Sequence, residues 1–150
     1  MKLLLDTHAL LWWWTSARSA QPVASLLDTH ALLWWWTNDA RLSATARSAI
    51  ADETNEIWVS AASAWEIATK HRLGKLQEAA DAVSRFNELV TADRFNHLSM
   101  NYLHALRAGS YTHEHRDPFD RMLAAQAELE GARLVSCDPV IAQIGVRLLW

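Results

Sequence analysis

Hydrophobic and polar positions change period repeatedly along this chain. Short apolar runs bounded by polar or turn residues predict buried strands, and apolar residues spaced three or four apart predict helices. Strands are predicted at 25–28, 56–60, 95–98, 133–136 and 146–150. Helices are predicted at 29–36, 44–51, 63–73, 77–91, 100–108, 118–130 and 139–144. This alternation favours an α/β fold with a mostly parallel sheet covered by helices on both faces.

The front of the chain contains an internal repeat. The sequence LLDTHALLWWWT occupies residues 4–15 and again residues 26–37, an offset of 26 − 4 = 22 positions. Two copies are too few for a stacked repeat array. With 150 residues, 51% of them hydrophobic, the chain suits one domain, which needs only one copy. We therefore expect residues 1–24 to be a duplicated strand–helix appendage and linker, and residues 25–150 to form the domain.

The repeat offers two aspartates, Asp6 and Asp28, for the end of the first strand. We expect Asp28 to be the working residue and Asp6 to be its duplicate. Use of Asp6 would push residues 15–37 out as a long excursion, with a second apolar strand and three tryptophans left to bury. Long structureless connections are uncommon inside compact domains.

Acidic residues stand at the junctions between the predicted strands and helices. Asp28 and Asp138 follow strands, Glu66 lies near the start of a helix, and Asp117 and Asp120 open another. Parallel strands gather their carboxyl ends at one edge of a sheet, and ligands bind there. We therefore expect these five acids to converge in space.

Each acid also has an ordinary structural explanation. The aspartates that precede helices can simply cap them. Glu66 can close a capping box that begins at Ser63, or form an ion pair with Lys70 four residues on. These explanations account for the acids singly, but not for their joint appearance at one edge of the predicted sheet.

A cluster of carboxylates needs a counter-charge. At a separation of 4 Å and an effective dielectric near 20, each like-charged pair costs about 4 kcal/mol. A divalent cation removes this cost, and ligands that are all oxygen favour Mg²⁺ or Mn²⁺. Such ions polarise phosphoryl oxygens and activate water, so the acids suggest hydrolysis of phosphodiesters.

Four segments together resemble the PIN-domain family, and within it the VapC-type toxins. They read LLDTHALLW from Leu26, SAASAWEIATK from Ser60, HRDPFDRMLAAQA from His115 and LVSCD from Leu134. They follow the family's order across residues 25–150, which the resemblance makes a PIN-like nuclease domain. The resemblance implies a three-layer α/β/α sandwich, endonucleolytic cleavage of RNA, and a small VapB-like antitoxin that blocks the site.

The resemblance also assigns roles to residues. It makes Asp28, Glu66, Asp120 and Asp138 the metal-binding, catalytic acids. Asp117 is a further candidate for the metal site, and Ser136 stands where the family often has a threonine or serine that helps to hold water or metal. Arg116 borders the acidic loop and is a candidate for phosphate contact, although a solvated loop residue fits equally well. The chain departs from the family in having two strand-plus-acid units.

Charge and cysteine content refine this interpretation. The net charge of −3 argues against binding nucleic acid by backbone charge alone, but four acids bound to metal would leave −3 + 4 = +1. Cys137 is the only cysteine, so no internal disulfide can form and a reducing cytoplasm fits. The histidines show no zinc-ligand spacing with it. We expect no export signal and no membrane span.

Trp34, Trp35 and Trp36 would spread around most of a helix, so we expect one of them to be left for an interface, in a homodimer or with the antitoxin. Two other functions stay open. One is a PIN fold whose site is disrupted by the duplication and which acts only as a binding partner. The other is a phosphatase-like hydrolase, which would need a second acid two residues after Asp28, where His30 stands.

Overall fold

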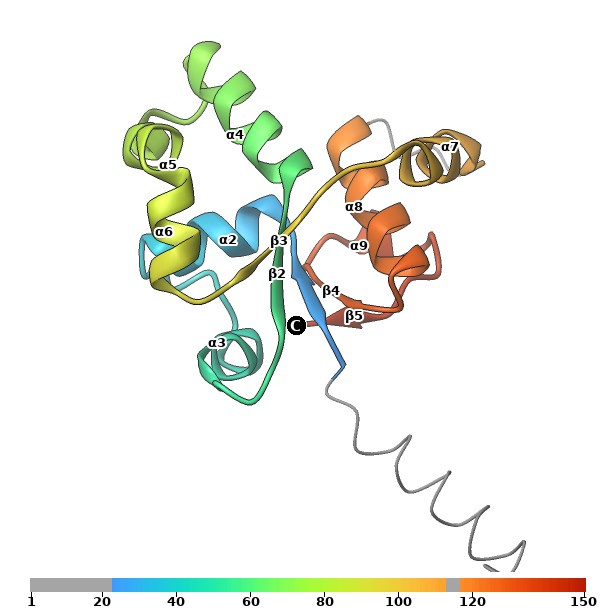
Figure 1. Cartoon of the computed structure of the whole chain (residues 1–150), viewed down its shortest axis with the longest axis horizontal. Coiled ribbons are helices and arrows are strands. Elements are labelled where there is room, and N and C mark those ends of the chain that lie inside the picture. Colours follow the sequence, from blue (N-terminus) through green and yellow to red (C-terminus); the bar gives the residue numbers. More distant parts are fainter. Residues whose placement is uncertain (1–22, 113–116) are drawn as a thin grey trace, which may run out of the picture.

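A computed structural model describes residues 23–112 and 117–150 of the chain. The centre of this part is a five-stranded sheet in the order β3-β2-β1-β4-β5, in which every pairing is parallel (Figure 1). The strands are β1 Ser25–Leu27, β2 Ile57–Ser60, β3 Asn96–Leu98, β4 Arg133–Val135 and β5 Leu148–Leu149. The expected parallel sheet is confirmed.

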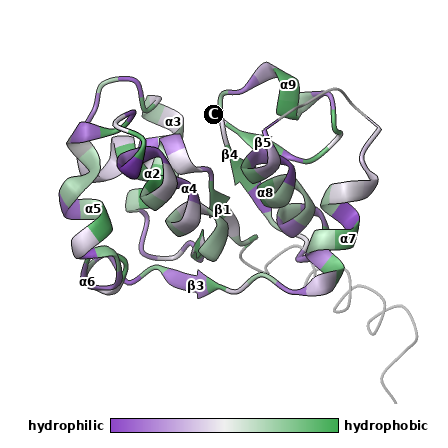
Figure 2. Ribbon diagram, turned by 90° about the horizontal axis from the view of Figure 1, so that it is seen from above, coloured by the Kyte–Doolittle hydropathy of each residue, from purple (hydrophilic) through white to green (hydrophobic). Residues whose placement is uncertain are grey.

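Helices connect the strands and form two outer layers. They are α2 Thr29–Trp36, α3 Ala44–Ala51, α4 Ala61–Arg72, η1 Gln77–Ala79, α5 Ala80–Ser84, α6 Phe86–Ala92, α7 Tyr102–Ser110, α8 Pro118–Leu129 and α9 Pro139–Ala142. Figure 2 shows α2, α3, α5 and α6 on one side of the sheet and α7, α8 and α9 on the other. The three-layer α/β/α sandwich is therefore confirmed. No helix among the described residues is long and apolar enough to cross a membrane.

The sheet divides the core into two because successive strand side chains point to opposite faces. Leu27, Val59 and Val135 pack with α2, α3 and α6 on one face. Leu26 and Leu134 pack with α8 and α9 on the other. The central strands are buried on both faces, which explains why they read as continuous apolar runs in the sequence.

The central strand comes from the second copy of the repeat. Ser25–Leu27 lies between β2 and β4, and Asp28 follows directly as the N-cap of α2. Asp6 and the rest of the first copy lie outside the described residues, as does Arg116. The structure thus places Asp28 at the carboxyl end of the strand from which the sheet extends in both directions.

Helix starts differ from the sequence-based predictions at two places. The helix predicted from residue 63 begins at Ala61, and its N-cap is Ser60, the last residue of β2, whose Oγ accepts a hydrogen bond from Ala62 N at 2.9 Å. The predicted capping box from Ser63 is therefore wrong. The helix predicted from residue 100 begins at Tyr102, because Asn101 and not Ser99 provides the cap.

The single helix predicted over residues 77–91 is also wrong. The segment forms η1, α5 and α6 in succession, and the helical path is interrupted at Arg85, whose φ is −124°. A 3.6-residue period reports which side chains face the core. It does not report whether the backbone hydrogen bonds continue from one turn to the next.

Candidate active site

The helices α2, α4 and α8 all begin at the carboxyl ends of the strands, which is the upper end of the sheet in Figure 1. Asp28 stands there, only 5% exposed. Its Oδ1 accepts a hydrogen bond from Ala31 N at 2.7 Å. Burial raises the pKa of Asp28, although hydrogen bonds from Ser136 and Ala31 and the charge of His30 lower it.

Glu66 lies in the second turn of α4 and is almost completely buried. Its Oε2 accepts a hydrogen bond from Lys70 Nζ, which confirms the ion pair predicted four residues along the helix. Its Oε1 is buried without a hydrogen-bond partner among the described residues. An unsatisfied buried carboxylate oxygen is costly, so this atom marks a place where a further positive ligand would be stabilising.

Asp117 and Asp120 bring two more carboxylates from the start of α8. Asp117 caps the helix by accepting from Phe119 N at 2.9 Å, and its Oδ2 lies 3.9 Å from Lys70 Nζ. Asp120 follows in the first turn. Burial, and after it the charges of Asp117, Glu66, Asp28 and Asp138, raise the pKa of Asp120 to about 8. The five predicted acids therefore lie close enough to influence one another.

Asp138 closes the group from the start of α9. It caps this helix by accepting from Val140 N at 2.8 Å. Ser136 is buried beside it, accepts a hydrogen bond from Asp138 N at 3.1 Å and hydrogen-bonds to Asp28. The predicted supporting serine thus joins two of the acids. Cys137 stands between Ser136 and Asp138 in the sequence. Burial raises the pKa of its thiol, with smaller contributions from the charges of Asp28 and Asp138. This thiol is therefore a poor nucleophile.

Gln126 was not singled out from the sequence. It is buried on α8, where its side chain accepts a hydrogen bond from Ser60 Oγ and donates to Ser99 O at 3.3 Å. It thereby ties α8 to the ends of β2 and β3. The available signal was a polar amide in the middle of the apolar face of LAAQA.

The donor set fits a divalent cation in its chemistry. All five side chains offer carboxylate oxygens, Glu66 Oε1 lacks a hydrogen-bond partner among the described residues, and the other four acids add to the effect of burial in raising the pKa of Asp120. Within residues 23–112 and 117–150, no three acidic, histidine or cysteine side chains converge tightly enough to hold an ion as they stand. Lys70 instead supplies the positive charge between Glu66 and Asp117.

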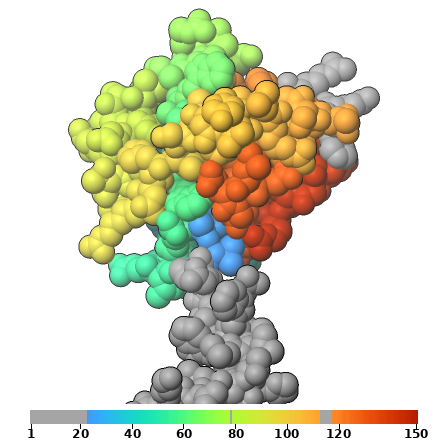
Figure 3. Space-filling view, turned by 45° about the vertical axis from the view of Figure 1, so that its right-hand side comes forward, coloured from blue at the N-terminus to red at the C-terminus, as the bar shows by residue number. Residues whose placement is uncertain are grey.

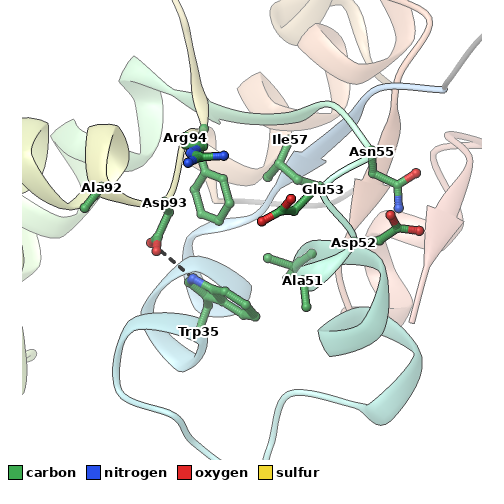
Figure 4. A pocket seen from close by; sticks show the side chains of 11 residues that line it. Trp35, Ala51, Asp52, Glu53, Asn55, Ile57, Ala92, Asp93 and Arg94 are labelled. Carbon is green, nitrogen blue, oxygen red and sulfur yellow. Dashed lines mark hydrogen bonds between the residues drawn. The ribbon is translucent and has the colours of Figure 1, made fainter.

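A cavity lies elsewhere in the fold, and none of these acids lines it. It has a volume of about 430 Å³, and Trp35, Asp93 and Arg94 line it together with residues before β2 and β3 (Figure 4). Asp93 Oδ2 accepts hydrogen bonds from Trp35 Nε1 at 3.1 Å and Trp36 Nε1 at 3.0 Å. This cavity lies near the amino ends of β2 and β3, whereas the acids lie at the carboxyl ends of the strands; we call this side the opposite edge of the sheet.

The same contacts change the expectation for the tryptophans. Trp34, Trp35 and Trp36 are all half-buried and packed against the core, so none of the three is fully exposed as the sequence suggested. The helix is crowded by aromatic neighbours on several sides, since Phe86, Phe95 and Trp150 contact it. Among the tryptophans of the described residues, the exposed one is Trp65, at 58%.

Comparisons with known proteins agree with this fold. A family model described as PIN domain matches residues 25–146. One chain of the crystal structure of VapBC2 from Rickettsia felis bound to a DNA fragment from their promoter is similar, with a TM-score of 0.56 and 16% identity. The match covers 83% of this chain and 96% of that chain, and at this identity the likeness concerns the fold. No curated protein matches the sequence.

The first prediction concerns Asp120 in the metal-free protein. Its pKa is raised from 3.8 to about 8, so between these values the folded chain holds a proton that the unfolded chain has lost. The free energy of unfolding therefore falls as the pH rises from about 4 to about 8. We expect Asp120→Asn to raise Tm near pH 8 by about 3 °C or more, and to change it little near pH 4. Thermal unfolding in chelator measures both, with exposed Asp81→Asn as the control. Equal Tm changes at the two pH values would contradict the prediction.

The second prediction concerns Lys70 as the internal counter-charge. Lys70→Met leaves the Glu66 carboxylate buried and unpaired, so we expect a loss of about 2 kcal/mol in the free energy of unfolding. This is less than for a fully buried pair because the Lys70 side chain is 28% exposed. Mg²⁺ should then raise Tm more in this variant than in the wild type, since the cation replaces the missing ammonium. The exposed Lys75→Met is the control, and an unchanged Mg²⁺ effect on Lys70→Met would refute the assignment.

Proposed function

Because this chain belongs to the PIN-domain family, we propose that it is a metal-dependent endoribonuclease, the toxin half of a VapC-type toxin–antitoxin pair. The observation that carries this proposal is the gathering of five carboxylates at the starts of α2, α4, α8 and α9, where burial and the charges of the other four acids raise the pKa of Asp120. Clustered acids of this kind are destabilising in the free protein, so their placement is explained by a ligand of opposite charge.

In this proposal Asp28, Glu66, Asp120 and Asp138 hold Mg²⁺ or Mn²⁺, and Asp117 is an additional oxygen donor. The bound cation would polarise a phosphoryl oxygen and lower the pKa of an attacking water. Ser136 fixes Asp28 by hydrogen bonding, and the backbone N–H groups of the capped helices fix one oxygen of each aspartate cap. The protein's contribution is thus to present carboxylate oxygens that cannot turn away from the site.

The proposed antitoxin is small and places a basic side chain among these acids. Lys70 supports this, because its ammonium already pairs with Glu66 and lies 3.9 Å from Asp117. An arginine from a partner would satisfy further carboxylate oxygens by charge-assisted hydrogen bonds. The similar crystal structure contains VapBC2 on DNA, which makes a VapB-like protein the proposed class of partner.

We also propose a homodimer, formed through α7. Tyr102, Leu103 and Leu106 on this helix are 74%, 55% and 67% exposed. Trp65 on α4 borders the same surface, where a cavity of about 200 Å³ separates it from Ala105. Figure 3 shows α7 on the outside of the molecule beside α4 and α8. Exposed apolar side chains grouped in this way are typical of protein interfaces.

The third prediction tests the site and the repeat together. We expect the protein without residues 1–22 and the Asp6→Asn variant to cleave RNA in Mg²⁺ like the wild type. A chelator should abolish cleavage by all three proteins. Asp28→Asn should lower the cleavage rate at least about 100-fold, because losing a ligand costs more than losing a group that only supports one. Circular dichroism checks that each variant folds.

If Asp6→Asn is the inactive variant, the first copy holds the site and our register is wrong. Full cleavage by folded Asp28→Asn, or cleavage that survives chelator, would exclude the proposed metal site. A wild type that binds the antitoxin but cleaves no RNA under any metal would instead favour a protein that acts only as a binding partner.

The fourth prediction concerns the dimer. Leu106→Glu places a charge in the centre of the exposed α7 surface, and we expect it to convert a dimer into a monomer at micromolar concentration. Light scattering coupled to size exclusion measures the mass. Leu129→Glu is the matched control, since Leu129 is 49% exposed at the end of α8. A monomeric wild type, or a dimer unaffected by Leu106→Glu, would rule out this interface.

A further inference from the structure

A cleft lies along α2. It contains none of the five acids and is separate from the cavity lined by Trp35, Asp93 and Arg94. Its volume is about 260 Å³, somewhat below the roughly 300–1,000 Å³ of pockets for drug-sized ligands. The lining comes from α2, from Arg41 and from the segment between α4 and α5. The lining residues are His30, Leu33, Trp34, Thr37, Arg41, Lys75, Leu76 and Ala79.

Trp34 forms the aromatic part of this cleft. Its ring lies 5.8 Å from the Trp150 ring in an edge-on arrangement and 5.6 Å from the His30 ring. The Arg41 guanidinium lies 5.1 Å from the Trp34 ring centroid, where Asp39 holds it by hydrogen bonds of 3.0 Å and 2.7 Å. The cleft therefore contains an indole and a guanidinium plane, and groups of both kinds stack on nucleobases.

Lys75 provides the cationic part. It is exposed and follows the positive-φ residue Gly74. Among the described residues it has no ion-pair partner. His30 adds a second ring with donor capacity on the opposite wall. Because Asp39 largely neutralises Arg41, Lys75 and His30 are the groups that give the cleft its affinity for a negative ligand.

The cleft is connected to the acids through α2. Trp34 follows Asp28 by 34 − 28 = 6 residues, a distance of about 9 Å along a helix axis. His30 lies between them, close enough to Asp28 for its charge to lower the pKa of that carboxyl. A chain whose phosphate lies at the acids would therefore reach the cleft with a neighbouring nucleotide.

We propose that this cleft is a nucleotide subsite for single-stranded RNA. The base packs against Trp34 and Arg41, and Lys75 and His30 bind the adjacent phosphate. This inference rests on the proposed ribonuclease function and adds to it the part of the surface that grips the substrate. The cleft also answers part of the objection from net charge, since Lys75 offers RNA a local positive charge although the chain as a whole is acidic.

RNA fits this cleft better than a peptide does. A peptide strand would need unpaired backbone groups or a continuous apolar groove, whereas the lining combines one indole with basic and hydroxyl side chains. Sites for single-stranded nucleic acids usually combine an aromatic side chain that stacks on a base with neighbouring basic side chains that contact the phosphates. If a peptide occupies the cleft instead, the experiment below will detect it.

The experiment measures binding without cleavage. In an Asp120→Asn background with chelator, fluorescence anisotropy follows a labelled mixed-sequence RNA of about 12 nucleotides, within the roughly 4–16 that single-strand sites span. Lys75→Glu should weaken binding about tenfold, and Lys75→Ala should lower the slope of log affinity against log salt by about 0.7. Arg94→Glu is the control, because it changes net charge equally beside the large cavity at the opposite edge.

The aromatic part is tested in the same way. Trp34→Leu should weaken RNA binding about tenfold or more, as expected for the loss of one stacked base. Trp36→Leu is the matched control, since it removes a half-buried tryptophan of the same helix that does not line the cleft. Tm values establish that both variants fold. Photocrosslinking of 4-thiouridine RNA, read by mass spectrometry, should label the peptides that carry Trp34 and Lys75.

Each result decides between the proposals. Wild-type cleavage of RNA, with Lys75→Glu and Trp34→Leu binding RNA no more weakly than their controls, overturns the subsite and leaves the ribonuclease intact. Loss of antitoxin binding in Lys75→Glu with unchanged RNA binding makes the cleft a peptide site and also overturns it. A wild type that neither cleaves nor binds RNA ends the proposed function and this inference together.

Discussion

Mutual repulsion among buried and half-buried carboxylates is the constraint on which this structure depends. A parallel sheet brings every strand-to-helix junction to one edge, so acids placed at separate junctions meet there whether or not this is stabilising. Three features limit the cost. Helix N-termini face Asp28, Asp117 and Asp138, Lys70 pairs with Glu66, and the pKa of Asp120 is raised until it keeps its proton in neutral solution.

The same geometry removes an apparent conflict between two interpretations of the acids. From the sequence, capping and metal binding are competing explanations for an aspartate before a helix. In the structure, Asp28, Asp117 and Asp138 all cap helices through Oδ1. A carboxylate has two oxygens with about four acceptor sites, so a cap fixes its orientation without exhausting it. Capping is then a way of aiming a ligand, and the helix dipole offsets part of the repulsion before any cation arrives.

The sequence predicted the parts that depend on local pattern and on sheet topology. The strands, the two outer layers and the positions of the five acids all follow from those rules. The parts that it missed depend on contacts between distant residues or on the exact backbone path at the ends of elements. Gln126 meets Ser60 across 66 positions, and the amphipathic period over residues 77–91 conceals a break at Arg85. Glu66 was placed near the first turn because nothing local shows that β2 ends where its helix cap begins, at Ser60.

The repeat shows how strongly context decides between identical segments. Twelve identical residues have the same intrinsic preference for the central strand and α2, so the choice between them falls to the residues that come after each copy. After the second copy, Asn38 adopts a positive φ of 51°, and Asp39 donates its backbone N–H to Trp34 O at 2.8 Å. The Arg41 guanidinium then lies 5.1 Å from the Trp34 ring centroid, and Leu42 is 3% exposed in the core.

The residues at the matching positions after the first copy have smaller side chains, and only the backbone N–H donation of Asp39 could be reproduced by its counterpart. They are Ser16, Ala17, Ser19 and Ala20. Serine is less suited than asparagine to a positive φ, and alanine in place of a buried leucine costs about 2–5 kcal/mol. That difference exceeds the loop-closure term of about 0.6 kcal/mol per doubling of loop length, so side-chain packing after the repeat, more than chain connectivity, favours Asp28 as the residue at the centre of the sheet.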